Sequence, residues 1–259
     1  MRPIACRNKT NYIIQKMKKE AKQLRKLAKI IFILGVTLLA TIYIAEIIQY
    51  GNLLIEINVY EKLFASFMIY SAIVFHLLSK ENQPIKKSIR YLKSSFNYIY
   101  IIIALFIVSA TFGFIFAEKL SFLDEILREI ISKTIYLNSY ELTAFILMNN
   151  AIASLISIIG GIVVGIVPIL SSIGNGAVIG YVLEKVGIAS FWRLLPHGIF
   201  EIPAVFISFG LGIKLGFSIF NKKKFRERFY NSILVFAFII VPLLIIAAII
   251  EGLLIHFLP

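Results

Sequence analysis

Long uncharged runs alternate with short charged segments along this chain. Three runs hold no Asp, Glu, Lys or Arg: residues 94–117, 142–183 and 229–250, which are 24, 42 and 22 residues long. A helix needs roughly 20 apolar residues to cross a bilayer. Two more runs, 30–55 and 63–79, qualify if Glu46 and His76 are tolerated within the membrane. The pattern predicts an all-α fold, a polytopic transmembrane helix bundle of about seven spans.

The positions of the spans follow from the same pattern. We predict them at residues 30–49, 62–79, 98–117, 142–167, 177–192, 196–219 and 229–250. The 42-residue run is expected to hold two spans with a break at 168–176, because Pro, Ser, Asn and Gly punctuate helices. Glu184, Lys185 and Gly187 interrupt the short fifth span, which is therefore expected to be a broken or tilted helix.

Two segments outside these spans show the spacing of amphipathic helices that lie on a membrane surface. The first covers residues 9–29 and the second covers residues 121–134. In the second, Phe122, Ile126 and Ile130 share one face and are expected to face lipid or the bundle. The basic segment 80–97 is expected to be a loop.

The distribution of charge indicates the orientation in the membrane. The net charge is +13, and residues 2–29, 80–93 and 222–228 together hold 20 of the 27 basic residues with only 3 of the 14 acidic ones. Basic clusters beside apolar spans are typical of cytoplasmic segments. We therefore expect a cytoplasmic amino terminus, an external carboxyl terminus and contacts with anionic lipids, and we expect no nucleic-acid partner.

Composition narrows the function classes further. Hydrophobic residues make up 59% of the chain and the mean hydropathy is +0.87, which leaves no room for a separate soluble enzyme domain. Cys6 is the only cysteine, so an intrachain disulfide is excluded. No metal site and no cofactor are expected, because two candidate ligands in an HGIFE segment do not make a site.

Candidate chemistry concentrates in residues 149–216, which hold 11 of the 15 glycines. Five polar side chains interrupt this apolar segment: Asn149, Asn150, Asn175, His197 and Glu201. Hydrocarbon penalises such groups unless they pair or line a cavity. His197 and Glu201 are four residues apart, so they share a helix face if a helix begins near Pro196. We expect these two to face the bundle interior and approach the asparagines.

Glycines in the same segment recur at small-xxx-small spacing. The pairs are Gly161 with Gly165, Gly176 with Gly180, and Gly212 with Gly216. Such a pair places two glycines on one helix face, where two backbones can approach closely. The pairs are expected to mark the tightest helix contacts.

The order of these motifs resembles the stage II sporulation protein M family of multi-pass membrane proteins. The matching residues are Asn149-Asn150, Gly161, Gly165, Asn175-Gly176, Gly180, Pro196-His197-Gly198, Glu201, Pro203-Ala204 and Gly212. The resemblance covers about residues 98–220. It divides the chain into a basic two-span extension at 1–97, a family-like core at 98–220, and a basic loop with the final span at 221–259.

The resemblance implies a scaffold, since the family's namesake organises a machine that remodels peptidoglycan in spore-forming bacteria. Other membrane proteins, or further copies of this chain, are then the expected partners. Two alternatives stay open from the residues. A transporter or channel could use the five polar side chains as a path, although no clear inverted repeat appears. An intramembrane hydrolase could use His197 and Glu201, but a nucleophile or third ligand is missing.

Overall fold

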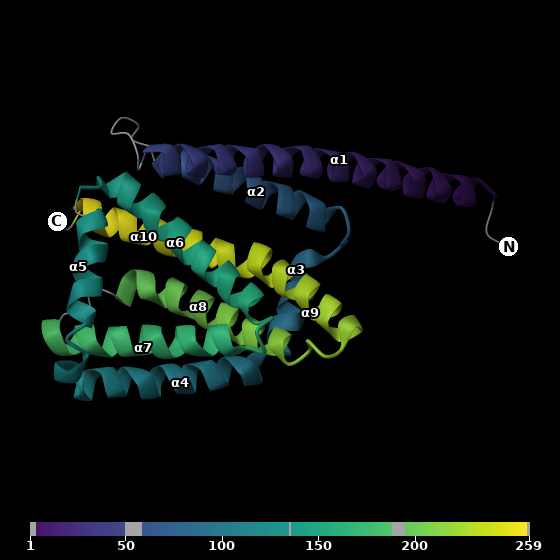
Figure 1. Cartoon of the computed structure of the whole chain (residues 1–259). Helices are drawn as coiled ribbons and strands as arrows, with labels where there is room; N and C mark the ends of the chain where they lie inside the picture. Colours follow the sequence, from purple (N-terminus) through teal and green to yellow (C-terminus); the bar gives the residue numbers. More distant parts are fainter. Residues whose placement is uncertain (1–3, 50–58, 135, 188–194, 258–259) are drawn as a thin grey trace. The chain divides into compact units, whose positions relative to one another are not determined.

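The chain is built of helices in the computed structural model, which describes residues 4–49, 59–134, 136–187 and 195–257; these ranges contain no strand (Figure 1). Side chains at 4–14, 43–49, 59–60, 130–131, 133–134, 195–197 and 255–257 fall outside the description. The all-α membrane bundle predicted from the sequence is confirmed. Contacts divide the chain into two units, Met1–Pro84 and Ile85–Pro259.

Unit 1 is a pair of packed helices, α1 (Ile4–Gln49) and α2 (Val59–Leu78). A methyl group placed on Gly35 of α1 would lie 3.2 Å from the carbonyl oxygen of Ala65, so the two backbones approach closely there. The sequence predicts a surface helix and a separate first span in this region, but α1 is one continuous helix. No Gly or Pro occurs between residues 9 and 34 to interrupt it.

Unit 2 contains the remaining elements. They are α3 (Pro84–Lys93), α4 (Phe96–Ile115), η1 (Ala117–Leu120), α5 (Leu123–Thr134), α6 (Ser139–Gly160), α7 (Ile166–Val186), α8 (Leu195–Gly216), α9 (Lys222–Val235), the π-helix η3 (Phe236–Ile240) and α10 (Val241–Phe257). α8 is central, because it contacts α4, α6, α7 and α10 and every residue from 207 to 216 is buried.

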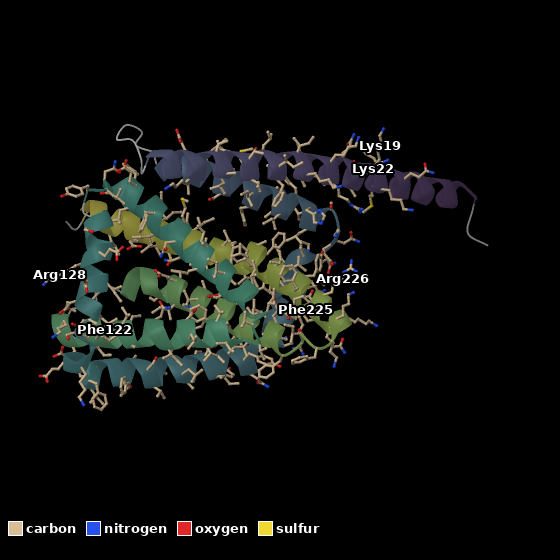
Figure 2. All side chains as sticks on the ribbon, in the orientation of Figure 1. Lys19, Lys22, Phe122, Arg128, Phe225 and Arg226 are labelled. Carbon is tan, nitrogen blue, oxygen red and sulfur yellow. The ribbon has the colours of Figure 1, made fainter. Side chains whose placement is uncertain are left out.

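The two ends of unit 2 differ in character. Figure 2 shows Arg128 of α5 and Phe122, which directly precedes α5, at one end, and Phe225 and Arg226 of α9 at the other. α3 lies at the same end as the start of α9, which we call the basic end (Figure 1). The prediction of a loop at 80–97 is wrong, since α3 occupies most of it. Pro84 starts this helix, where a missing N–H costs nothing.

Six helices in the described part of the chain are long and apolar enough to cross a membrane, rather than the predicted seven. They are Glu61–Leu78, Phe96–Ile115, Ser139–Gly160, Ile166–Val186, Gly198–Gly216 and Lys222–Leu254. The first predicted span, 30–49, forms the second half of α1 and is not among them. Its described side chains cover only the 13 residues 30–42, short of the roughly 20 that a span needs.

The predicted break at 168–176 is also wrong. The turn lies at residues 161–165, where Val164 and Gly165 have φ angles of 50° and 76°, and α7 is an uninterrupted helix of 21 residues. Pro168 is the third residue of α7, where a helix leaves the backbone N–H unbonded in any case. Gly161 and Gly165 therefore flank a turn instead of sharing one helix face.

Backbone-to-backbone contacts hold the spans of unit 2 together. A methyl group on Gly180 of α7 would overlap the carbonyl of Ala110 on α4, and one on Gly113 of α4 would overlap the carbonyl of Ala177. A methyl group on Gly161 would likewise overlap the carbonyl of Gly212 on α8. α4 and α8 thus pack against α7 and the α6–α7 turn at distances that only glycine permits.

α5 is anchored to the bundle by its first turn. Leu123 is buried and packs with Ala117 and Tyr181, and Leu127 packs against the same cluster. Tyr181 of α7 is fully buried, and its hydroxyl donates a hydrogen bond of 2.7 Å to a carboxylate oxygen of Asp124. Phe122 and Ile126 are exposed. The bundle-facing edge is therefore formed by Leu123 and Leu127, and Phe122 and Ile126 lie on the surface.

The hydrogen bond from Tyr181 to Asp124 leads to a stability prediction. Changing Tyr181 to Phe removes the donor while keeping the ring, and should lower the free energy of unfolding by about 1 kcal/mol. Thermal unfolding of the purified protein in detergent measures this. The same change at Tyr100, whose side chain is exposed, should be silent; equal effects at both positions would contradict an anchoring role.

Candidate functional site

Two carboxylates lie on neighbouring spans near the α5 end of unit 2. Glu201 lies in the second turn of α8 and Glu251 lies near the end of α10, and the two helices are in contact. Both side chains are partly buried, and they are close enough to interact electrostatically. α6 adjoins the pair, since a methyl group on Gly252 would lie 2.5 Å from the hydroxyl oxygen of Thr143. Two acidic groups inside spans are costly and typical of functional positions.

The asparagines have different surroundings. Asn149 is exposed and Asn150 is partly buried, and neither amide makes a hydrogen bond with another described residue. Asn175 is exposed, and its amide nitrogen donates a hydrogen bond of 2.7 Å to the carbonyl of Ser171 in the same helix. A bond to the carbonyl four residues earlier is a common way for a short polar side chain to be satisfied within a helix.

The five polar residues singled out from the sequence are thus placed as follows. Glu201 is close enough to Glu251 to interact with it electrostatically, a neighbour that the sequence does not suggest. Asn149 and Asn175 lie on the surface. The side chain of His197 falls outside the described residues. Its pairing with Glu201, and the convergence of the five groups, therefore stay predictions.

A second polar group, at the basic end, was not anticipated. Lys214 of α8 is only 6% exposed. Its ammonium group donates hydrogen bonds to the carbonyl oxygen of Ser94 (2.9 Å) and to the hydroxyls of Ser94 (2.8 Å) and Ser95 (2.9 Å). It also lies 4.0 Å from the centre of the Tyr91 ring. Together with Arg228, these residues form what we call the Lys214 cluster.

The remaining bonds of the Lys214 cluster join α9 to the same point. Arg228 donates a hydrogen bond of 2.5 Å to the carbonyl oxygen of Lys214, and the hydroxyl of Tyr91 donates to the carbonyl oxygen of Arg228 (3.4 Å). Burial raises the pKa of Tyr91 to about 12, so this hydroxyl keeps its proton near neutral pH. The cluster ties α3, the start of α4, the end of α8 and α9 together.

Electrostatically, the Lys214 cluster is a buried cation held by neutral groups. All three hydrogen bonds of the ammonium go to uncharged oxygens of described residues, and the Tyr91 ring adds a cation–π contact. This arrangement suits a structural role, in which the cluster holds α3 and α9 to the end of α8. The signal in the sequence is a lysine within an apolar span between Gly212 and Gly216, because an ionisable residue inside a span has a specific partner by default.

Metal chemistry finds no support in the described residues. They contain no group of three or more His, Cys, Asp or Glu side chains that could hold a metal ion. The candidate functional groups in the described part of unit 2 are the Glu201–Glu251 pair, the surface amides of Asn149 and Asn175, and the Lys214 cluster.

The comparison with known families decides the family. The sequence pattern of stage II sporulation protein M matches residues 102–254, which is more than half of the chain. This chain belongs to the stage II sporulation protein M family. Because its described residues include six helices long and apolar enough to cross a membrane, it is a multi-pass membrane protein. No curated protein and no solved structure matches it.

The stage II sporulation protein M segment is longer than the sequence motifs indicate. The motifs end near residue 220, whereas the match continues to residue 254 and includes α9 and most of α10. Both carboxylates, Glu201 and Glu251, and two members of the Lys214 cluster, Lys214 and Arg228, thus lie within the family segment. α1, α2 and α3 precede it.

The carboxylate pair leads to a prediction on Glu201. Changing Glu201 to Gln removes one of two neighbouring acidic groups and keeps a hydrogen-bonding group, so the protein should fold with unchanged or higher melting temperature. Changing it to Leu should lower the free energy of unfolding by about 1–3 kcal/mol, because on the predicted pairing the imidazole of His197 loses its partner. Thermal melting in detergent checks both, with Glu184→Leu at an exposed position as the control. An unchanged melting temperature for Glu201→Leu would contradict a paired role.

Proposed function

We propose that this protein is an integral membrane scaffold that gathers membrane or envelope-associated partners and carries out no catalysis of its own. The observation that supports this most is the position of the amides in the spans. Asn149 is residue 11 of the 22 in α6, Asn175 is residue 10 of the 21 in α7, and both side chains are exposed. Asn175 uses one N–H in its bond to Ser171, which leaves its second N–H and its amide oxygen. Near the middle of a bilayer, exposed amide donors and acceptors are costly unless another molecule bonds to them.

The way the spans pack supports the same proposal. Gly113, Gly180 and Gly212 bring backbones into direct contact at the α4–α7 and α6–α8 interfaces. Interfaces closed in this manner leave no space for a solute between these helices. Polar groups that face outward from a tightly packed bundle suit the binding of other transmembrane helices, including those of a second copy of the chain.

Photocrosslinking in native membranes tests the scaffold. A photoreactive residue at Asn149 or Asn175 should give adducts with a defined protein, either another membrane protein or a second copy of the chain. The same residue at Val108, whose apolar side chain is 68% exposed on α4, should give lipid adducts only. Changing Asn149 to Leu should weaken crosslinking from position 175 to the same partner. Lipid adducts alone at all three positions would refute the proposal.

The orientation is proposed from the charge distribution. The basic end and the amino terminus are cytoplasmic, and the end that carries α5 and the carboxyl terminus are external. Cys6 should then react with a membrane-impermeant thiol reagent only when the cytoplasmic face is accessible. Labelling of Cys6 from outside in intact cells would reverse the orientation; a Cys6→Ser chain controls for background.

A transporter is the second candidate, and the Glu201–Glu251 pair is the observation that favours it. Two neighbouring carboxylates within spans suit a site where a proton or a cation is taken up. Reconstituted vesicles separate the two candidates. A scaffold should show no proton or sodium flux above empty vesicles, whereas flux that is lost on changing Glu201 or Glu251 to Gln would support transport.

A further inference from the structure

The outer face of α3 carries exposed apolar side chains beside basic ones. Ile85 and Ile89 are 58% and 44% exposed, and Phe96, the first residue of α4, is 41% exposed. Ile85 and Ile89 lie about 40° apart around the helix axis, because successive residues are separated by roughly 100°. Lys86 and Arg90 are also exposed and follow each of them by one position. α3 therefore presents an apolar strip bordered by a basic strip.

The opposite face of α3 is fixed to the bundle, which sets the orientation of the outer face. Ser88 is fully buried, and Lys87 lies 5.0 Å from the centre of the Tyr230 ring on α9. Tyr91 contacts Lys214 and Arg228 within the Lys214 cluster. Because α3 is held on this side, it cannot rotate to bury Ile85 and Ile89 in unit 2.

The position of α3 along the chain places it at the edge of the bilayer. Only Ser94 and Ser95 separate α3 from α4, and α4 is a span that begins at Phe96. A helix directly joined to the start of a span lies at the level of the lipid headgroups. Exposed Ile and Phe side chains at this level reach the acyl chains, as in interfacial amphipathic helices.

The charge of α3 is of one sign. The ten residues of the helix include Lys86, Lys87, Arg90 and Lys93, and none is acidic. Lys86, Arg90 and Lys93 are exposed, so their charges are available to a ligand on the outer face. A basic juxtamembrane segment attracts anionic lipid headgroups, and each Lys or Arg near the surface strengthens this binding about fivefold.

We propose that the outer face of α3 is a binding site for anionic phospholipids. Ile85, Ile89 and Phe96 contact the acyl chains, and Lys86, Arg90 and Lys93 contact the headgroup phosphates of the same leaflet. Apolar and basic strips side by side match a molecule that has both a hydrocarbon tail and a negative headgroup. A soluble acidic protein or a free phosphate ion uses only the basic strip. This site does not depend on the scaffold function.

Lipid titration of the full chain tests the site. The delipidated protein in neutral detergent is titrated with phosphatidylglycerol or with phosphatidylcholine of the same acyl chains, at about 0.1 M ionic strength, and bound lipid is counted by native mass spectrometry. Phosphatidylglycerol should bind at least about tenfold more tightly. Changing Lys86, Arg90 and Lys93 together to Gln should remove at least about tenfold of this preference. The matched control changes Lys119, Arg128 and Lys185, three exposed basic residues towards the other end, to Gln and should keep the preference.

Two further arms identify the ligand. Changing Ile85 and Ile89 to Ser should weaken phosphatidylglycerol binding, and inorganic phosphate at matched ionic strength should not displace the lipid. Full retention of binding by the Ser variant, displacement by phosphate, or equal losses in the two Gln triple variants would each overturn the proposal.

A depth measurement keeps the proposal falsifiable if the triple variant does not fold. Cys6 is changed to Ser, Ile89 is changed to Cys, and a fluorophore is attached there. In vesicles of mixed phosphatidylglycerol and phosphatidylcholine, lipids with brominated acyl chains should quench this fluorophore strongly. A fluorophore at Arg90 should be quenched less. Equal weak quenching at both positions would place α3 away from the acyl chains and overturn the proposal.

Discussion

Replacement of Lys214 by Met should lower the free energy of unfolding by about 2–3 kcal/mol. The ammonium group makes three hydrogen bonds and one cation–π contact in a site that is 6% exposed. Methionine fills a similar volume but leaves the buried hydroxyl of Ser95 without this donor, and a buried unpaired acceptor costs about 1–3 kcal/mol. Relief of repulsion from Arg228 offsets only part of the loss.

The expected result is a lower melting temperature in detergent and faster proteolysis at the basic end, because α3 would lose its contacts with Lys214. Lys185 is the matched control, because it is a lysine near the other end of a span with an exposed side chain. Met at Lys185 should change the melting temperature little. If the Lys214→Met variant melts at or above the melting temperature of the unchanged protein, the desolvation cost of the ammonium outweighs its hydrogen bonds. The Lys214 cluster would then not stabilise the fold.

The second large effect is expected at Gly180. A methyl group there would overlap the carbonyl of Ala110, which is backbone and cannot move aside as a side chain can. Changing Gly180 to Ala must therefore separate α4 from α7, and should lower the free energy of unfolding by about 3 kcal/mol, at the upper end of the cost of overpacking.

Gly174 provides the control within the same helix. Nothing lies within 4 Å of a methyl group at Gly174. Ala at this position should raise the stability by up to about 1 kcal/mol, because Ala favours the helix more than Gly does. Opposite signs for the two Gly→Ala changes, measured by melting in detergent, are the expected outcome. A silent change at Gly180 would mean that α4 and α7 are not in backbone contact.

Hydrophobic runs and basic clusters were enough to predict an all-α membrane bundle, and the motif order was enough to predict the family. Both depend on local signals: a span must be apolar along its whole length, and the glycine and polar positions of the family lie in fixed order. The positions of the turns between helices were harder to predict. Pro168 and Asn175 read as helix breakers, yet Pro is harmless in a first turn and Asn175 bonds within its own helix.

The site could be predicted only where its partners lie on the same helix. The spacing of His197 and Glu201 suggests a shared face, but the neighbour of Glu201 that the structure shows, Glu251, is 50 residues away on α10. Likewise, Lys214 contacts Ser94, which is 120 residues earlier in the chain. Contacts between distant segments depend on how the helices pack, and one sequence does not carry that information.

The last span of unit 2 contains a π-helical segment, which accommodates one residue more than a regular α-helix would at the same place. α9, the π-helix Phe236–Ile240 and α10 run on without a loop, and Phe236, Ala237 and Ile240 of the π segment are buried. A π turn holds one residue more than an α turn, so it absorbs a single inserted residue while the flanking turns keep their faces. Family members in which this span is α-helical throughout should therefore be one residue shorter between the positions of Val235 and Val241. Deleting one residue here should therefore leave α9 and α10 on their present neighbours with little loss of stability. A large loss would show instead that the deletion rotates one helix by about 100° against the other.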